Sequence, residues 1–136
     1  MNDAYFMREA IKDAQLYGHR FGAILVKNNK IIALSGNRPQ SDPRFHAETQ
    51  AILNAGKDLE GCTLYTTCEP CPMCFYMAWV THVSRLVYGA TLVDSLAAGF
   101  SEINLSVEEL NNKVNNILEI KKGVLREECI TLLLNK

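Results

Sequence analysis

The sequence lacks several features that would place it in a specialised class of protein. None of its apolar runs approaches the roughly 20 residues that a transmembrane helix needs, so no membrane span is expected. Residues 1–5 contain no basic residue and no apolar stretch, which argues against a secretory signal peptide. Because the chain has 14 basic and 15 acidic residues, it also lacks the basic excess that is typical of nucleic-acid-binding proteins. Internal repeats, low-complexity tracts and linker-like segments are missing too, and we therefore expect one domain spanning residues 1–136.

Cysteine is present in an odd number, five, and Cys71 and Cys74 form a CxxC pair. In a chain without a secretory signal, such a pair is more typical of metal or redox chemistry than of a disulfide framework. This cysteine usage fits a reducing compartment, so a cytoplasmic location is expected. With 48% hydrophobic and 21% charged residues, the composition is that of an ordinary globular domain that can bury a core.

Hydrophobic periodicity and turn residues predict helices that alternate with short strands. Strand, helix and strand over residues 62–88 should form a right-handed βαβ unit with parallel strands. Residues 27–30, which include two asparagines, are typical of a tight hairpin turn. We expect an α/β protein, specifically a three-layer α/β/α sandwich with a five-stranded mixed sheet. Helices are predicted at residues 3–17, 46–55, 72–82, 92–98, 106–113 and 124–134, and strands at residues 21–26, 31–34, 62–67, 83–88 and 117–120.

The stretch from His46 to Cys74 has the residue types of a catalytic zinc site. His46, Cys71 and Cys74 offer one imidazole nitrogen and two thiolates, and a catalytic zinc keeps its fourth position open for water. Cys71 and Cys74 are one helical turn apart, so both sulfurs can reach one ion. If His46 and Cys71 both begin helices, the positive ends of those helices favour thiolates at the metal. Glu48 would then place a carboxylate beside the metal, in a position suited to general acid–base catalysis.

The order of these residues is similar to the H-x-E…P-C-x-x-C pattern of zinc deaminases that act on nucleobases. His46-Ala47-Glu48 matches its first part, and Pro70-Cys71-Pro72-Met73-Cys74 matches its second. On these residues the chain is identified as a member of the cytidine deaminase superfamily. The resemblance implies one zinc per chain, hydrolytic removal of an exocyclic amine from a nucleobase, and Glu48 as the general acid–base. It also implies a homodimer.

Two branches of this superfamily resemble the chain more than the others do. Residues 66–74 and the segment 94–100 look like bacterial guanine deaminase, which implies that guanine is converted to xanthine and that Asp94 contacts the base. Asn37-Arg38-Pro39 and residues 123–129 resemble tRNA adenosine deaminases, so adenosine-to-inosine conversion in tRNA is an alternative, as is deamination of cytosine or another small heterocycle. The chain departs from both branches, since it has neither a basic C-terminal extension nor any aromatic residue after Phe100. The residues that the resemblance assigns to substrate binding are Asn37, Phe45, Ala47 and Asp94.

Other interpretations of the cysteines stay open at this point. A CxxC can be a redox pair or two core cysteines, and Cys68-x-x-Cys71-x-x-Cys74 partly resembles an iron–sulfur run that lacks its fourth Cys-Pro. A closed structural zinc site could take Cys68 or Cys62 as its fourth ligand, but a closed site gives no role to Glu48.

The substrate-binding residues have simpler interpretations as well. Asn37 could only cap a loop, and Asp94 could only cap a helix. For the whole chain, a zinc-stabilised interaction module and an RNA-binding deaminase-like subunit are the two non-enzyme alternatives. Glu48 argues against the first of them, and the slightly acidic charge balance argues against the second.

Overall fold

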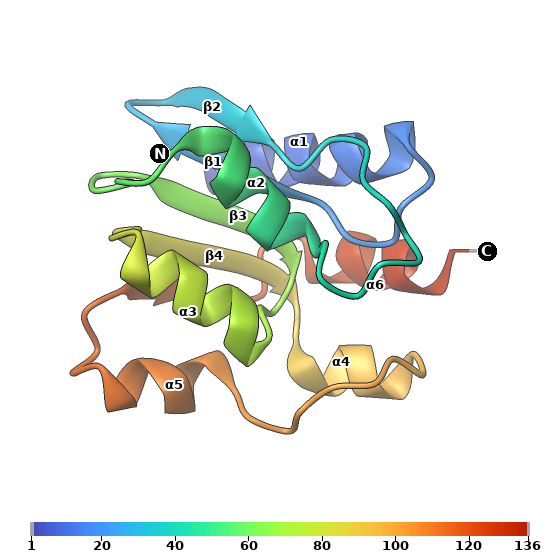
Figure 1. The fold of residues 1–136 in the computed structure, drawn as a ribbon. Helices are drawn as coiled ribbons and strands as arrows, with labels where there is room; N and C mark the ends of the chain where they lie inside the picture. Colours follow the sequence, from blue (N-terminus) through green and yellow to red (C-terminus); the bar gives the residue numbers. More distant parts are fainter. Residues whose placement is uncertain (1, 136) are drawn as a thin grey trace.

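The computed structural model describes residues 2–135 and has a five-stranded mixed sheet covered by helices on both faces (Figure 1). The strands are β1 Ala23–Lys27, β2 Lys30–Leu34, β3 Thr63–Cys68, β4 Arg85–Ala90 and β5 Glu119–Lys121. The helices are α1 Asp3–Leu16, α2 Ala47–Ala55, α3 Pro72–Val80, α4 Leu92–Ala97, α5 Val107–Lys113 and α6 Arg126–Leu134. None of these helices is long and apolar enough to cross a membrane.

The strand order is β2-β1-β3-β4-β5, with β1 antiparallel to both of its neighbours and β3, β4 and β5 mutually parallel. The parallel pairing of β3 with β4 around α3 is the predicted βαβ unit, and the predicted fold class is confirmed. Asn28 and Asn29 form the turn between β1 and β2, with φ of 52° and 60°, because asparagine tolerates the left-handed region that a tight hairpin requires.

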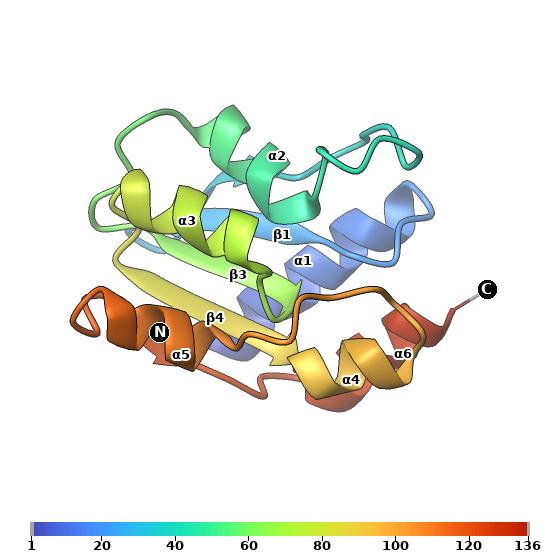
Figure 2. The same ribbon diagram turned by 60° about the horizontal axis from the view of Figure 1, so that its bottom comes forward.

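Two hydrophobic clusters fill the space between the sheet and its helices. Phe75 of α3 belongs to the cluster under α2, α3 and α5, whereas Met7 of α1 belongs to the cluster under α1 and α6 (Figures 1 and 2). Neighbouring residues of β3, Leu64 and Tyr65, enter opposite clusters because successive side chains of a strand point to opposite faces. Both are fully buried, so β3 lies at the centre of the molecule.

Two elements near the C-terminus begin later than the sequence predicts, and each shift has a local cause. The last strand starts at Glu119 because the backbone N and O of Leu118 are both bonded to the side chain of Asn111, at 3.2 and 2.9 Å. The last helix starts at Arg126 because Leu125 has φ of 52°, in the left-handed region, and cannot belong to a right-handed helix.

Candidate active site

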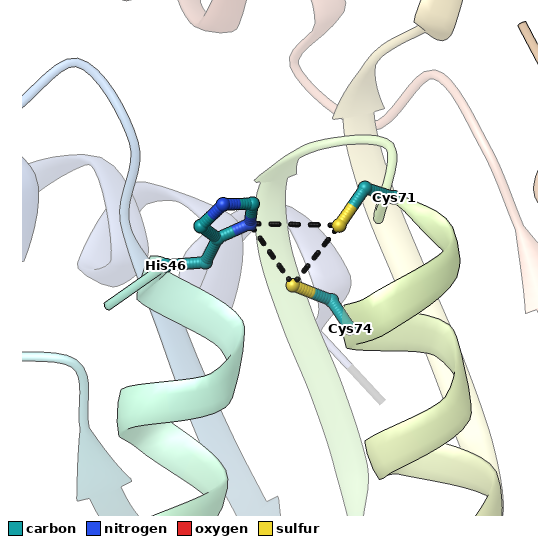
Figure 3. A group of neighbouring side chains, drawn as sticks. All are labelled: His46, Cys71 and Cys74. Carbon is teal, nitrogen blue, oxygen red and sulfur yellow. Dashed lines mark hydrogen bonds between the residues drawn. The ribbon is translucent and has the colours of Figure 1, made fainter. Parts of the chain in front are cut away.

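His46, Cys71 and Cys74 converge at the end of the sheet where β3 finishes (Figure 3). His46 Nδ1 lies 3.5 Å from Cys71 Sγ and 3.4 Å from Cys74 Sγ, and the two sulfurs are 3.5 Å apart. Donors around a tetrahedral zinc, with bonds of about 2.0–2.3 Å, are separated by roughly 3.5–3.8 Å. The donor types and their spacing therefore fit zinc, with one coordination position left for water.

The two ligand-bearing segments are both helix starts, as the sequence predicts. His46 is the N-cap of α2, and its backbone N–H donates to Thr49 Oγ1 at 3.2 Å. Cys71 is the N-cap of α3, where Pro72 occupies the first helical position at no cost, because its missing N–H would have no partner there. Cys74 follows in the first turn of the same helix. The positive ends of two helix dipoles thus face one metal site.

The two thiols titrate very differently. Hydrogen bonds with Cys74 and His46 lower the pKa of Cys71 to about 4, although burial acts in the opposite direction. The pKa of Cys74 is raised well above its usual range by its hydrogen bond with Cys71 and by burial. A metal ion binds both sulfurs as thiolates, so metal binding releases any proton that the pair holds.

Glu48 lies in the first turn of α2 with only 6% of its surface exposed. Burial, reinforced by the charge of Cys71, raises its pKa to about 7, whereas the positive charges of His46 and Arg38 act against this shift. A bound cation would also lower this pKa. A buried carboxyl beside the metal ligands is placed to accept a proton and to return it during a reaction at the metal.

A pocket of about 480 Å³ opens beside the metal ligands and includes Glu48 in its lining. This volume is typical of sites for small organic molecules. Phe21 and Phe100 form an apolar part of the wall, with their rings edge to face at 4.9 Å between centroids. The Arg20 guanidinium lies 5.8 Å from the centre of the Phe100 ring and also lines the pocket.

The structure brings some of the predicted substrate-binding residues to this pocket and leaves others outside it. Phe45 and Ala47 line the pocket together with Glu48. Asn37 is exposed and does not belong to the lining.

Asp94 is also absent from the pocket lining. Its carboxylate accepts a hydrogen bond from the backbone N of Thr91, at 2.8 Å, at the start of α4. The Arg126 guanidinium donates two more, at 2.9 and 2.8 Å, and lowers the pKa of Asp94 to about 2. Through these hydrogen bonds Asp94 caps α4 and connects it to α6.

Cys68 and Cys62 are placed differently from the three ligands. Cys62 precedes β3 and Cys68 ends it, so the length of the strand separates them. Cys68 lines the pocket, but it does not belong to the metal-ligating group, and burial raises the pKa of its thiol.

Glu102 and Arg38 are among the charged residues of the pocket that sequence reasoning did not assign to the site. Glu102 lies between α4 and α5, and its Oε2 accepts a hydrogen bond from the buried hydroxyl of Ser95 at 2.7 Å. Arg38 is half-buried and donates to the carbonyl oxygen of Phe21 at 2.9 Å, while its buried Nη1 has no acceptor among residues 2–135. Glu102 belongs to no recognisable spacing pattern, so no signal in the sequence pointed to it. Arg38 was visible only as part of the resemblance to tRNA deaminases.

Comparisons with known proteins agree with the geometry of this site. Residues 1–90 match the family described as "Cytidine and deoxycytidylate deaminase zinc-binding region". The tRNA-specific adenosine deaminase of Bacillus subtilis (strain 168) is 38% identical and aligns over 93% of this chain and 83% of its own length. Guanine deaminase of the same organism is 37% identical over 75% of this chain and 73% of its own. Among solved structures, guanine deaminase from Nitrosomonas europaea has a TM-score of 0.78 at 26% identity and covers 96% of this chain and 80% of its own.

Fold and site together define a zinc-dependent hydrolase that removes an amine from a nucleobase or nucleoside. The chain belongs to the cytidine and deoxycytidylate deaminase family. The predicted family, enzyme class and zinc cofactor are therefore confirmed.

Proposed function

We propose that this protein converts guanine to xanthine and ammonia. The observation that carries the proposal is Glu102, a carboxylate in the pocket wall that Ser95 holds in place. Guanine presents a ring N–H beside its exocyclic amine, and a carboxylate accepts such donors in charge-assisted hydrogen bonds. Adenine lacks a donor on the ring nitrogen beside its amine, so the same carboxylate would leave it less well held. The relationship to guanine deaminases supports this substrate.

The reaction replaces the bond between the ring carbon and the exocyclic amine with a bond to a water oxygen. When bound by His46, Cys71 and Cys74, zinc supplies the activation of that water by lowering its pKa toward neutrality. Glu48 accepts the proton that the attacking water loses, and it returns protons to the ring nitrogen and to the departing ammonia. The buried position of Glu48 within the pocket lining supports this role.

Adenosine in tRNA is the second candidate substrate, because a tRNA-specific adenosine deaminase is similar over nearly the whole chain. A tRNA ligand requires neutralisation of several phosphates by basic side chains. The chain has 14 basic and 15 acidic residues, which favours the free base over tRNA.

Ammonia release from a panel of substrates tests the proposal. The panel contains guanine, adenine, cytosine, their nucleosides and an anticodon stem-loop, each supplied to the zinc-loaded protein. Guanine is expected to be the preferred substrate, and Glu102→Gln is expected to raise KM for guanine roughly tenfold through loss of one charge-assisted hydrogen bond. Conversion of the stem-loop to inosine, at a rate that collapses with rising salt, together with no reaction of guanine, would overturn the proposal.

A further inference from the structure

Glu69 follows β3 directly and lies two residues before the metal ligand Cys71. Its backbone N–H donates to the carbonyl oxygen of Ala90, at 2.8 Å, and continues the pairing of β3 with β4. Its half-buried carboxylate also reaches two helices. Oε1 accepts from the backbone N of Leu92, the first residue of α4, and Oε2 accepts from the backbone N of Val107, the first residue of α5, both at 2.8 Å.

These two hydrogen bonds are not needed to cap the helices. Each helix has its own capping box, made by Thr91 and Asp94 in α4 and by Ser106 and Glu109 in α5. Glu69 instead takes the N–H of the first helical residue in each case. Because the acceptor is ionised and partly removed from water, such bonds are among the stronger ones in a protein. They therefore fix the starts of α4 and α5 relative to the segment that carries Cys71.

The segment held between these two anchors carries part of the pocket wall. It runs from α4 to α5 (orange in Figure 2) and includes Phe100 and Glu102. Ser95, on the anchored helix α4, donates its hydroxyl proton to Glu102 at 2.7 Å, and its carbonyl oxygen accepts from the backbone N of Phe100 at 3.2 Å. The chain of contacts thus runs from Glu69 through α4 and Ser95 to Glu102.

We propose that Glu69 is a positioning residue that holds Glu102 at the distance from the zinc ligands that the substrate requires. The inference rests on the proposed function, in which Glu102 contacts the base. Glu69 also lines the pocket, but each of its carboxylate oxygens already accepts a backbone hydrogen bond. Its proposed role is to set the spacing between the segment that carries Cys71 and the wall that carries Glu102.

Glu69→Gln tests this inference, because an amide keeps one acceptor and turns an N–H group toward the second backbone donor. The variant should keep its zinc, with KM for the base raised roughly tenfold and kcat changed much less. Leu92→Pro should also raise KM. Proline has no N–H to donate to Glu69 Oε1, and it is well tolerated at the first position of a helix. The extended Thr91, with ψ of 170°, is compatible with a following proline. Glu109→Gln is the matched control. It removes an exposed capping carboxylate from α5 but leaves both hydrogen bonds to Glu69 intact.

A double substitution separates positioning from general stabilisation. If Glu69 acts through Glu102, adding Glu69→Gln to Glu102→Gln should change KM by no more than about twofold. A full tenfold effect in that background, an unchanged KM in Glu69→Gln, or a loss of zinc with kcat would each overturn the inference.

Amide hydrogen exchange tests the positioning role of Glu69 independently of any substrate. Exchange at residues 98–106 should be faster in Glu69→Gln than in the wild type and unchanged in Glu109→Gln. Equal exchange in all three proteins would refute the positioning role of Glu69, even if the protein deaminates guanine. Faster exchange in a protein that does not deaminate guanine would contradict the proposed function alone.

Discussion

At the scale of single residues, the sequence pattern identifies the ligands of the metal but not every group that surrounds it. A histidine and two cysteines with fixed spacing can be recognised because zinc restricts donor type and geometry. The structure places these donors 3.4–3.5 Å apart. Cys68 shares the CxxC spacing with Cys71, and only the structure shows that its buried thiol stands apart from the group of three.

Cys68→Ser should therefore keep one zinc per chain. The Cys68 sulfur does not belong to the group of donor atoms that lie within 4.8 Å of one another, so it is not placed to complete the coordination of the ion. Cys71→Ser is the matched comparison, since it replaces the thiol with the lowered pKa and should lose most of the zinc. Metal analysis of the two purified variants checks this prediction. Loss of zinc from Cys68→Ser would indicate a closed site with four protein ligands.

Asp94 and Glu102 show why the residues of the pocket wall are harder to predict than metal ligands. Asp94 is a carboxylate at a helix start, and the sequence alone allows both a cap and a base contact there. Its pairing with Arg126, 32 residues further along the chain, depends on how α6 packs against α4 and is invisible locally. Glu102 lies in the irregular segment between α4 and α5, so no periodicity could assign its direction.

At the scale of elements, hydrophobic periodicity predicts which segments are helices and strands, while short-range contacts and backbone conformation decide where two of them begin. The Asn111 side chain delays β5, and the left-handed Leu125 delays α6. The position of α1 on the sheet depends on charges that no local pattern reveals. Asp3, in its first turn, accepts hydrogen bonds from Arg85 at 2.7 and 2.8 Å and from Tyr65 at 2.6 Å.

Asp3→Asn should lower the free energy of unfolding at pH 7 by roughly 1.5–3 kcal/mol, the usual value of hydrogen bonds to a charged group. The side chain of Asp3 is 8% exposed and that of Arg85 is 15% exposed, so solvent screens this pair only weakly. Glu119→Gln is the control, because Glu119 bonds the same arginine but is 70% exposed and should contribute less than about 1 kcal/mol. Urea unfolding of the three proteins measures the difference.

The same pair gives a prediction for pH. Hydrogen bonding from Arg85 holds the pKa of Asp3 well below its usual range. A carboxyl with a depressed pKa in the folded state stabilises the fold fully above its unfolded pKa of about 3.9, and this contribution is lost as the pH falls below that value. The difference between wild type and Asp3→Asn should therefore be constant from about pH 7 to pH 5 and shrink below about pH 4. A difference that stays constant down to pH 3 would show that the charge of Asp3 is not its source.

At the scale of the whole molecule, α3 exposes a row of large apolar side chains that residues 2–135 leave open to solvent. Met73, Tyr76 and Val80 recur at three- and four-residue spacing on α3 and are 41%, 57% and 48% exposed. This face supports the predicted homodimer, in which two copies of α3 would cover each other. Sedimentation of the wild type should give twice the mass of one chain. Tyr76→Glu should shift the protein toward monomer, whereas Val93→Glu, an equally apolar and more exposed position on α4, should not. A monomeric wild type would contradict the dimer.

The measurement that tests the central claim most directly is xanthine formation from guanine by wild type and Glu48→Gln, each loaded with one zinc. We predict that the wild type forms xanthine and one ammonia per guanine. Glu48→Gln should fold and keep its zinc but lose activity by a factor on the order of 10²–10⁴ or more, because it cannot transfer the protons of the reaction. Xanthine formation at a comparable rate in the variant would remove Glu48 from the chemistry. Absence of xanthine in the wild type would contradict the guanine assignment.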